Sequence, residues 1–231
     1  MTKPEDKAPR SQQPLTRADS RVEIHGAEAR HYDLLMNVIT FGTYPFFIRR
    51  AVRDLDIGET DAILDLGAGT GRNACLMLRY LSPGGRIVGL DVSEEMLSQA
   101  RRRCRRHPNV SFERRRIEKP LPYREEFDKV FIAFVLHGLV QEDRLEVVRN
   151  AWNALKAGGE FLILDYNEMD LERSSLITRY IFERIECPLA ADFVGRDWKG
   201  ILSENGFLGF RSRLYYSGNV RLLGARKPRD R

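Results

Sequence analysis

AILDLGAGTGRNA, residues 62–74, joins an apolar run to three glycines at alternate positions. A short run that is almost continuously apolar predicts a strand buried on both faces of a parallel sheet. The glycines predict a tight turn in which a ligand can approach the main chain without meeting Cβ atoms. Polar residues follow the last glycine and indicate that a helix begins near Arg72. This stretch therefore predicts a strand, a ligand-binding loop and a helix in immediate succession.

Further strand-like runs follow along the chain, alternating with helical patterns: GRIVGLD, NVSFER, FDKVFIAF and GEFLILDY. Helices are expected to begin near Arg72, Ser93 and Glu142, with others near 171–186 and 196–205. Two final runs, FLGFRSRLYY and NVRLLGAR, are joined by a Ser-Gly turn typical of a hairpin. We therefore predict an α/β fold with a doubly wound, mostly parallel sheet of seven strands that ends in an antiparallel hairpin.

The chain of 231 residues is long enough for a single α/β domain. Residues 1–21 are polar and contain proline, and we expect a disordered leader there. Residues 22–231 are expected to form one domain, in which 22–57 supplies an N-terminal helical lid. This lid consists of two helices separated by a turn at residues 42–45.

The three cysteines, Cys75, Cys104 and Cys187, are widely separated and odd in number. This argues against a disulfide framework and favours a reducing cytoplasm. On this interpretation Cys75 is a small buried hydrophobic residue. The four histidines show no metal-ligand spacing, so no metal is expected.

Arginines dominate the net charge of +5, and many cluster at 101–106 and 114–116. A solvated face is the favoured interpretation, and a peripheral contact with an anionic membrane surface stays open. The charge is accompanied by no nucleic-acid-binding motif, so no nucleic-acid partner is expected. The sequence does not indicate an oligomeric state.

The glycine spacing GxGxG bears on whether the loop binds a dinucleotide or another ligand. A dinucleotide fingerprint reads GxGxxG, which argues against a nicotinamide-dependent dehydrogenase. The run from Asp65 to Gly71 instead resembles the first motif of class I S-adenosylmethionine-dependent methyltransferases. Asp91 ends the next strand, where a carboxylate can accept two hydrogen bonds from a ribose diol. Asp65 either orients the methionine ammonium through a water molecule or braces the loop.

Several segments from residue 28 to 227 resemble the ubiquinone/menaquinone biosynthesis C-methyltransferase family: the helix at 32–42, IEKPLPYREEFDKV, AFVLHGL, LKAGGEFLILDY and the C-terminal hairpin. The resemblance implies S-adenosylmethionine as the cofactor and a Rossmann-like class I fold. The residues expected at the cofactor are Asp65, Gly67, Ala68, Gly69, Thr70, Gly71, Asp91, Val92, Met96, Arg116, Ile117 and Ala133.

The chain departs from this family where the acceptor would bind. His137-Gly138 replaces an Arg-Asn pair of the family. A second departure lies in the motif that the resemblance places at the adenine, where Arg116 stands in place of Asp or Asn and the main chain of Ile117 is expected to meet the adenine instead. We expect a small aromatic or apolar acceptor, with a lipid-head-group acceptor and a non-catalytic cofactor-binding protein as alternatives. His137 is the candidate general base, although a structural histidine at a helix start explains it equally well. Tyr32 is a further candidate for contact with the acceptor.

Overall fold

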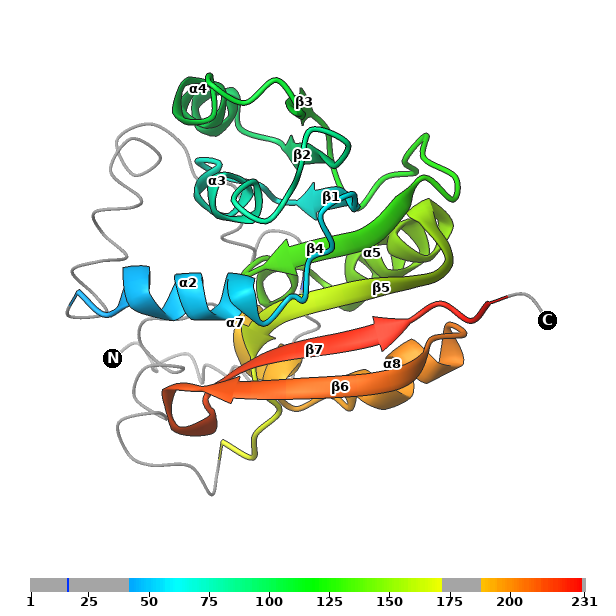
Figure 1. Cartoon of the computed structure of the whole chain (residues 1–231). Helices are drawn as coiled ribbons and strands as arrows, with labels where there is room; N and C mark the ends of the chain where they lie inside the picture. Colours follow the sequence, from blue (N-terminus) through cyan, green and yellow to red (C-terminus); the bar gives the residue numbers. More distant parts are fainter. Residues whose placement is uncertain (1–15, 17–41, 172–187, 230–231) are drawn as a thin grey trace, which may run out of the picture.

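The computed structural model describes residue 16 and residues 42–171 and 188–229. Seven strands form one sheet in the order β3-β2-β1-β4-β5-β7-β6 (Figure 1). Their bounds are β1 Ala62–Leu66, β2 Arg86–Asp91, β3 Val110–Arg114, β4 Phe127–Ala133, β5 Leu155–Tyr166, β6 Leu208–Tyr215 and β7 Val220–Arg226. Strands β1 to β5 pair in parallel, and β7 runs antiparallel between β5 and β6. The predicted doubly wound sheet with a terminal hairpin is confirmed.

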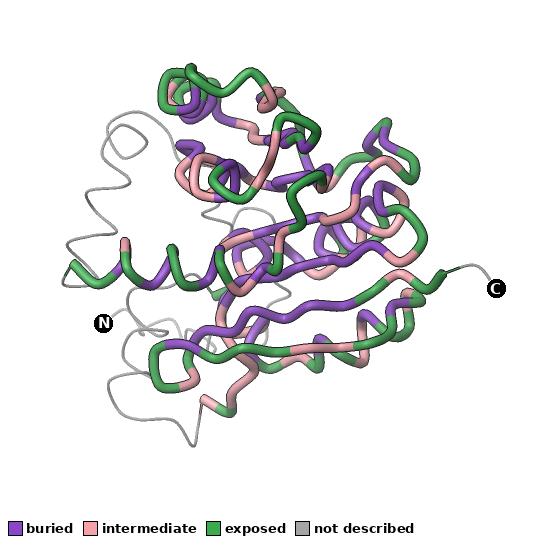
Figure 2. Tube along the Cα trace, in the orientation of Figure 1, coloured by how far each residue is buried: buried purple, intermediate pink, exposed green. Residues whose placement is uncertain are grey.

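Helices cover both faces of the sheet (Figure 1). They are α2 Tyr44–Arg53, α3 Arg72–Met77, α4 Glu94–Arg103, α5 Gln141–Ala154, α7 Pro188–Val194 and α8 Trp198–Glu204. Side chains of α2, α3 and α4 share one hydrophobic core with Ile63 and Phe131, whereas α5, α7 and α8 share another with Leu64 and Val130. Since neighbouring residues of one strand enter different cores, β1 is buried along its whole length and the middle of β2, β4 and β5 is buried as well (Figure 2).

Predicted helix starts are confirmed at α3, α4 and α5. Ser93 caps α4 by accepting a hydrogen bond from the Met96 N–H at 3.4 Å, and Asp197 caps α8 in the same way through Gly200. Helix α2 begins at Tyr44, within the predicted turn at 42–45, with Thr43 as its N-cap. The predicted leader, the helix before that turn, Tyr32 and the segment 172–187 lie outside the described residues.

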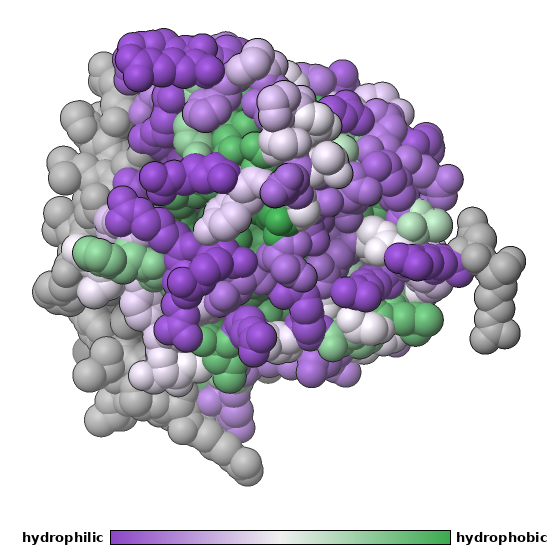
Figure 3. Space-filling model, in the orientation of Figure 1, coloured by the Kyte–Doolittle hydropathy of each residue, from purple (hydrophilic) through white to green (hydrophobic). Residues whose placement is uncertain are grey.

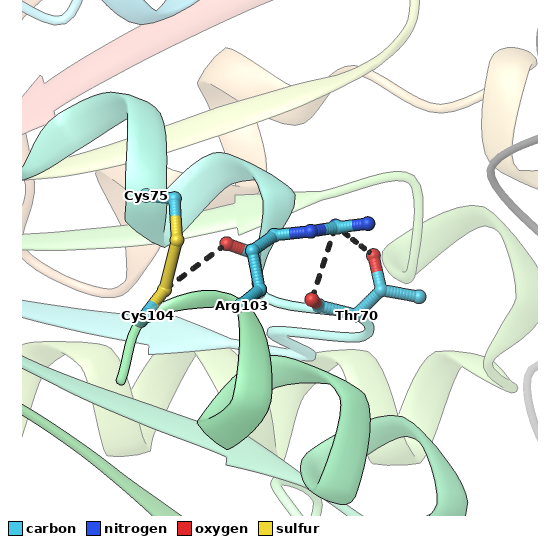
Figure 4. The surroundings of a disulfide bond; sticks show 5 residues. Thr70, Cys75, Arg103 and Cys104 are labelled. Atoms are coloured by element: carbon cyan, nitrogen blue, oxygen red, sulfur yellow. Dashed lines mark hydrogen bonds between the residues drawn. A yellow bond between two sulfur atoms is a disulfide. The ribbon is translucent and has the colours of Figure 1, made fainter. Parts of the chain in front are cut away.

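The cysteine prediction was wrong. Cys75 of α3 and Cys104, directly after α4, form a disulfide with their Cα atoms 5.8 Å apart (Figure 4). The two helices pack on the same face of the sheet, which brings together residues separated by 29 positions in the sequence. Cys75 is thus a cross-link and not a free hydrophobic residue. The pairing removes the cysteine-based reason for a reducing compartment, because disulfides are typical of oxidising ones.

None of the helices in the described part of the chain has both the length and the apolar character needed to cross a membrane.

Candidate functional site

The glycine loop, residues 67–71, closes onto the carboxyl end of β2. The N–H groups of Gly67 and Ala68 both donate to the Leu90 carbonyl at 2.8 Å, and the Gly71 N–H donates to Ala68 at 3.0 Å. The loop therefore lies at the carboxyl edge of the parallel strands. Ligands of doubly wound folds bind at this edge.

Two of the loop glycines serve different purposes. Gly71 has φ +72°, and a Cβ there would lie 2.8 Å from the Cβ of Ala100 and 2.9 Å from its Cα. This glycine is required by close packing of the loop against α4. Gly69 has φ +52°, but a Cβ there would meet no atom of the described residues within 4 Å, its chain neighbours aside. Gly69 therefore presents bare main chain away from the protein interior, as close approach of a ligand requires.

Asp91 lies directly beside this exposed main chain. One carboxylate oxygen accepts the Gly69 N–H and the other accepts the Ser93 N–H, both at 2.9 Å. Burial raises the pKa of Asp91, while these backbone donors act in the opposite direction. Each carboxylate oxygen can accept more than one hydrogen bond, so the group can still receive a diol. The structure thus brings Asp91 and the loop together, and its role in holding ribose stays a prediction.

One carboxylate oxygen of Asp65 is buried and unsatisfied by the described residues. The residue is 1% exposed, and its Oδ2 makes no hydrogen bond within the part of the chain that the structure describes. Burial first, and the negative charge of Asp91 second, raise the pKa of Asp65 to about 7. An uncompensated carboxyl is costly in a core, and such groups occur preferentially where a site needs them. A cationic group of a ligand beside the loop would satisfy it.

Thr70 is held by Arg103, which is not among the site residues predicted from the sequence. One guanidinium nitrogen of Arg103 donates to the Thr70 hydroxyl at 2.6 Å and to its carbonyl at 3.1 Å (Figure 4). Arg103 immediately precedes the disulfide-bonded Cys104, whose sulfur lies 3.7 Å from the Gly71 carbonyl. The end of α4 therefore fixes both the side chain and the main chain of the glycine loop.

The residues expected near an adenine occupy different environments. Ile117 is buried, and its carbonyl accepts the Asn150 side-chain N–H at 2.8 Å. Arg116 is exposed and forms an ion pair with Glu118 at 3.1 Å. Of the remaining candidates, Met96 is buried, whereas Val92 and Ala133 are half-buried at the carboxyl ends of β2 and β4. Contact of these residues with a cofactor stays a prediction.

His137 forms a dyad with Asp165, on the other side of β4 from the loop. The His137 Nδ1 lies 2.7 Å from one carboxylate oxygen of Asp165, and its main-chain N–H donates to the other at 3.3 Å. The Asp165 side chain is 2% exposed and that of His137 15%. The Tyr166 ring packs 5.0 Å from the imidazole. A carboxylate that accepts a hydrogen bond from Nδ1 favours the neutral tautomer with its proton on Nδ1. In that tautomer Nε2 carries the lone pair that can accept a proton.

Arg144 holds the backbone around this dyad. Its fully buried guanidinium donates to the carbonyls of Leu136, His137 and Leu189 at 2.9, 3.2 and 2.8 Å, and to Asp192. Arg144 thereby joins the short helical turn Leu136–Gly138 to α7. A buried arginine with a carboxylate partner and three carbonyl acceptors is a rigid support.

Sequence reasoning did not predict three residues that support the site: Asp165, Arg103 and Arg144. A signal existed for Asp165, because an acid at the end of LILDY lies at the carboxyl edge of a strand that pairs with the one before His137. Arg103 is one member of an arginine run, and nothing in its sequence context distinguishes it from its neighbours. Arg144 resembles an ordinary charged residue of an amphipathic helix.

Residues 63–159 match the family model of a methyltransferase domain. The curated ubiquinone/menaquinone biosynthesis C-methyltransferase UbiE of Proteus mirabilis (strain HI4320) is 29% identical over 159 residues, 67% of this chain and 62% of the relative. The chain therefore spans less than two thirds of that relative's length.

Solved structures share the fold. A SAM dependent methyltransferase from Aquifex aeolicus superposes with a TM-score of 0.60 at 19% identity, covering 78% of this chain and 89% of that one. Human N-acetylserotonin methyltransferase, solved in complex with SAM, gives 0.62 at 22% identity over 81% and 53% of the two chains.

Proposed function

We propose that this chain, which carries a class I S-adenosylmethionine-dependent methyltransferase domain, transfers a methyl group from S-adenosylmethionine to a small aromatic or apolar acceptor. The observation that carries the proposal is the edge formed by Gly69, Asp91 and Asp65. It combines bare main chain, a carboxylate anchored beside it, and a second buried carboxyl with an unsatisfied oxygen.

These groups match the chemistry of the cofactor. Asp91 is suited to accept the ribose hydroxyls, and Asp65 to face the cationic methionine end. When bound, S-adenosylmethionine supplies a methyl carbon activated by a sulfonium. The protein's contribution is then to fix the acceptor in line with that carbon and to exclude water, which can be worth roughly 7–11 kcal/mol.

The His137–Asp165 dyad is suited to remove a proton from the acceptor. The Asp165 carboxylate orients the imidazole and stabilises its protonated form, so the opposite ring nitrogen acts as the general base. Such a base is useful when the acceptor is an aromatic carbon or a phenol. The aromatic rings of Tyr166 and Phe193 around His137 favour an apolar acceptor. The name of the curated relative adds a quinone-like compound to the candidates.

The test has two parts. Calorimetry with S-adenosylmethionine, S-adenosylhomocysteine and NAD is expected to show binding of the first two ligands only. Incubation with a cell extract and methyl-deuterated S-adenosylmethionine should then label a small molecule by one methyl group in mass spectrometry. Preferential binding of NAD refutes the ligand class, and tight S-adenosylmethionine binding without any labelled product favours a non-catalytic binding protein.

Replacing Asp91 by alanine is expected to weaken S-adenosylmethionine binding by about 1–3 kcal/mol, because charge-assisted hydrogen bonds to ribose are lost. Calorimetry measures this loss. Asp197→Ala is the matched control, since it removes the carboxylate that caps α8, in the opposite helical layer. The control should lose about 1 kcal/mol of stability and keep its affinity. Wild-type affinity in folded Asp91→Ala would exclude the ribose role.

A further inference from the structure

Helix α2 carries a basic stripe on its outward side. Phe46, Arg49, Arg50 and Arg53 follow the spacing i, i+3, i+4 and i+7, which places them along one helix face. The opposite face is buried in the core. Phe46 is 73% exposed, an unusual degree for a large apolar side chain, and the three arginines are exposed as well.

A groove lies between this stripe and the end of α3. It has a volume of about 320 Å³, and its far side is formed by Leu76, Arg79 and Tyr80. Among the residues that the structure describes, its lining includes four arginines and no acidic residue. The Arg49 guanidinium lies 6.0 Å from the Phe46 ring centre, so cationic and aromatic groups alternate along the opening.

Further positive charge lies at the C-terminal end of α4, a helix of the same layer as α2 and α3. Arg102, Arg105 and Arg106 are exposed there. Together with Arg49, Arg50, Arg53 and Arg79 they form what we call the basic face. In the part of the chain that the structure describes, none of these seven arginines takes part in an ion pair. Figure 3 shows hydrophilic atoms surrounding hydrophobic ones over α2 and α3.

The other helical layer is different. Helix α5 contains Glu142, Asp143 and Glu146 beside its two arginines. Arg144 and Arg149 are both neutralised by carboxylates, at Asp192 and Glu146 respectively. The net positive charge of the chain is therefore not spread evenly. Among the described residues, seven exposed arginines without an ion pair lie on the side of α2, α3 and α4, whereas both arginines of α5 are paired.

We propose that the basic face docks on a membrane surface rich in anionic phospholipids. Guanidinium groups pair well with phosphate oxygens, and each basic residue near an anionic leaflet adds to the attraction. The exposed Phe46 on an otherwise basic stripe is typical of a helix that lies in the interface with an apolar side chain among the lipids.

The experiment is co-sedimentation of the full chain with vesicles of phosphatidylcholine alone or with about one third phosphatidylglycerol. Binding is expected only to the anionic vesicles, and should weaken when salt rises from about 0.1 M to 0.5 M. The triple variant R49E/R50E/R53E should bind at least about tenfold more weakly. Phe46→Ala should lose roughly threefold to tenfold, with little dependence on salt.

The matched control is R149E/R213E/R226E, which changes the net charge equally at exposed arginines outside the basic face. It should retain more vesicle binding than the α2 variant at equal melting temperature. Equal loss in both triple variants, or equal binding of wild type to neutral vesicles, would overturn the proposal. Binding of RNA, lost in the α2 variant and without vesicle binding, would assign the face to nucleic acid. Since vesicle binding needs no methyl acceptor, the result is independent of the proposed activity.

Discussion

The variant His137→Ala should lose about 100-fold to 10,000-fold in turnover, the range for removal of a general base. Its affinity for S-adenosylmethionine should stay within about threefold, because the dyad lies beyond β4 from the glycine loop. The measurement is single-turnover transfer to the acceptor identified by the labelling experiment, together with calorimetry of the cofactor. A parallel loss of affinity would instead point to a structural role.

Two further variants sharpen this result. Asp165→Asn leaves the imidazole in place but removes the carboxylate that orients it, so turnover should fall while the fold persists. His107→Ala removes an exposed histidine that follows α4, and it should leave turnover unchanged. If His137→Ala turns over at the wild-type rate, the dyad plays no part in proton removal and methyl transfer needs no base from this side chain.

Asp65→Asn should stabilise the cofactor-free protein at pH 8 by roughly 2–4 kcal/mol. The pKa of Asp65 is about 7 in the folded chain against 3.8 for the free side chain. Between these values the unfolded chain has lost this proton while the folded chain retains it. Raising the pH through this interval therefore lowers the free energy of unfolding of the wild type. The asparagine variant lacks this contribution, so the difference between the two proteins should grow from pH 4 to about pH 7 and then level off.

The same variant should bind S-adenosylmethionine more weakly. A cationic ligand end beside Asp65 favours the carboxylate, so binding should release a proton and wild-type affinity should fall below pH 7, by at most about tenfold per pH unit. Denaturant unfolding and calorimetry across pH measure both effects. Leu64→Val is a suitable control, because it perturbs the same strand without a titratable group. Wild-type and Asp65→Asn curves that run parallel from pH 4 to 8 would refute the raised pKa.

Much of the candidate site follows from local sequence. The run AILDL and the three glycines predicted both the first strand and the loop, since strand burial and glycine conformation depend on nearby residues. Asp91 could be placed beside the loop because parallel neighbouring strands end at one edge of the sheet. Ser93 as a helix cap needed only its immediate sequence context.

The sequence by itself determined the order of strands and helices, the glycine loop and the acid at the end of β2, because each depends on patterns within a few residues. Only the tertiary structure decided which distant groups meet. It brought Asp165 into contact with His137, 28 positions away in the sequence, and Arg103 into contact with Thr70, 33 positions away. It also joined Cys75 to Cys104, 29 positions away, in a disulfide. It also placed seven exposed arginines, which form no ion pair with the described residues, in one helical layer, since the packing of helices on two faces of the sheet sorts exposed residues in a way that no local pattern encodes.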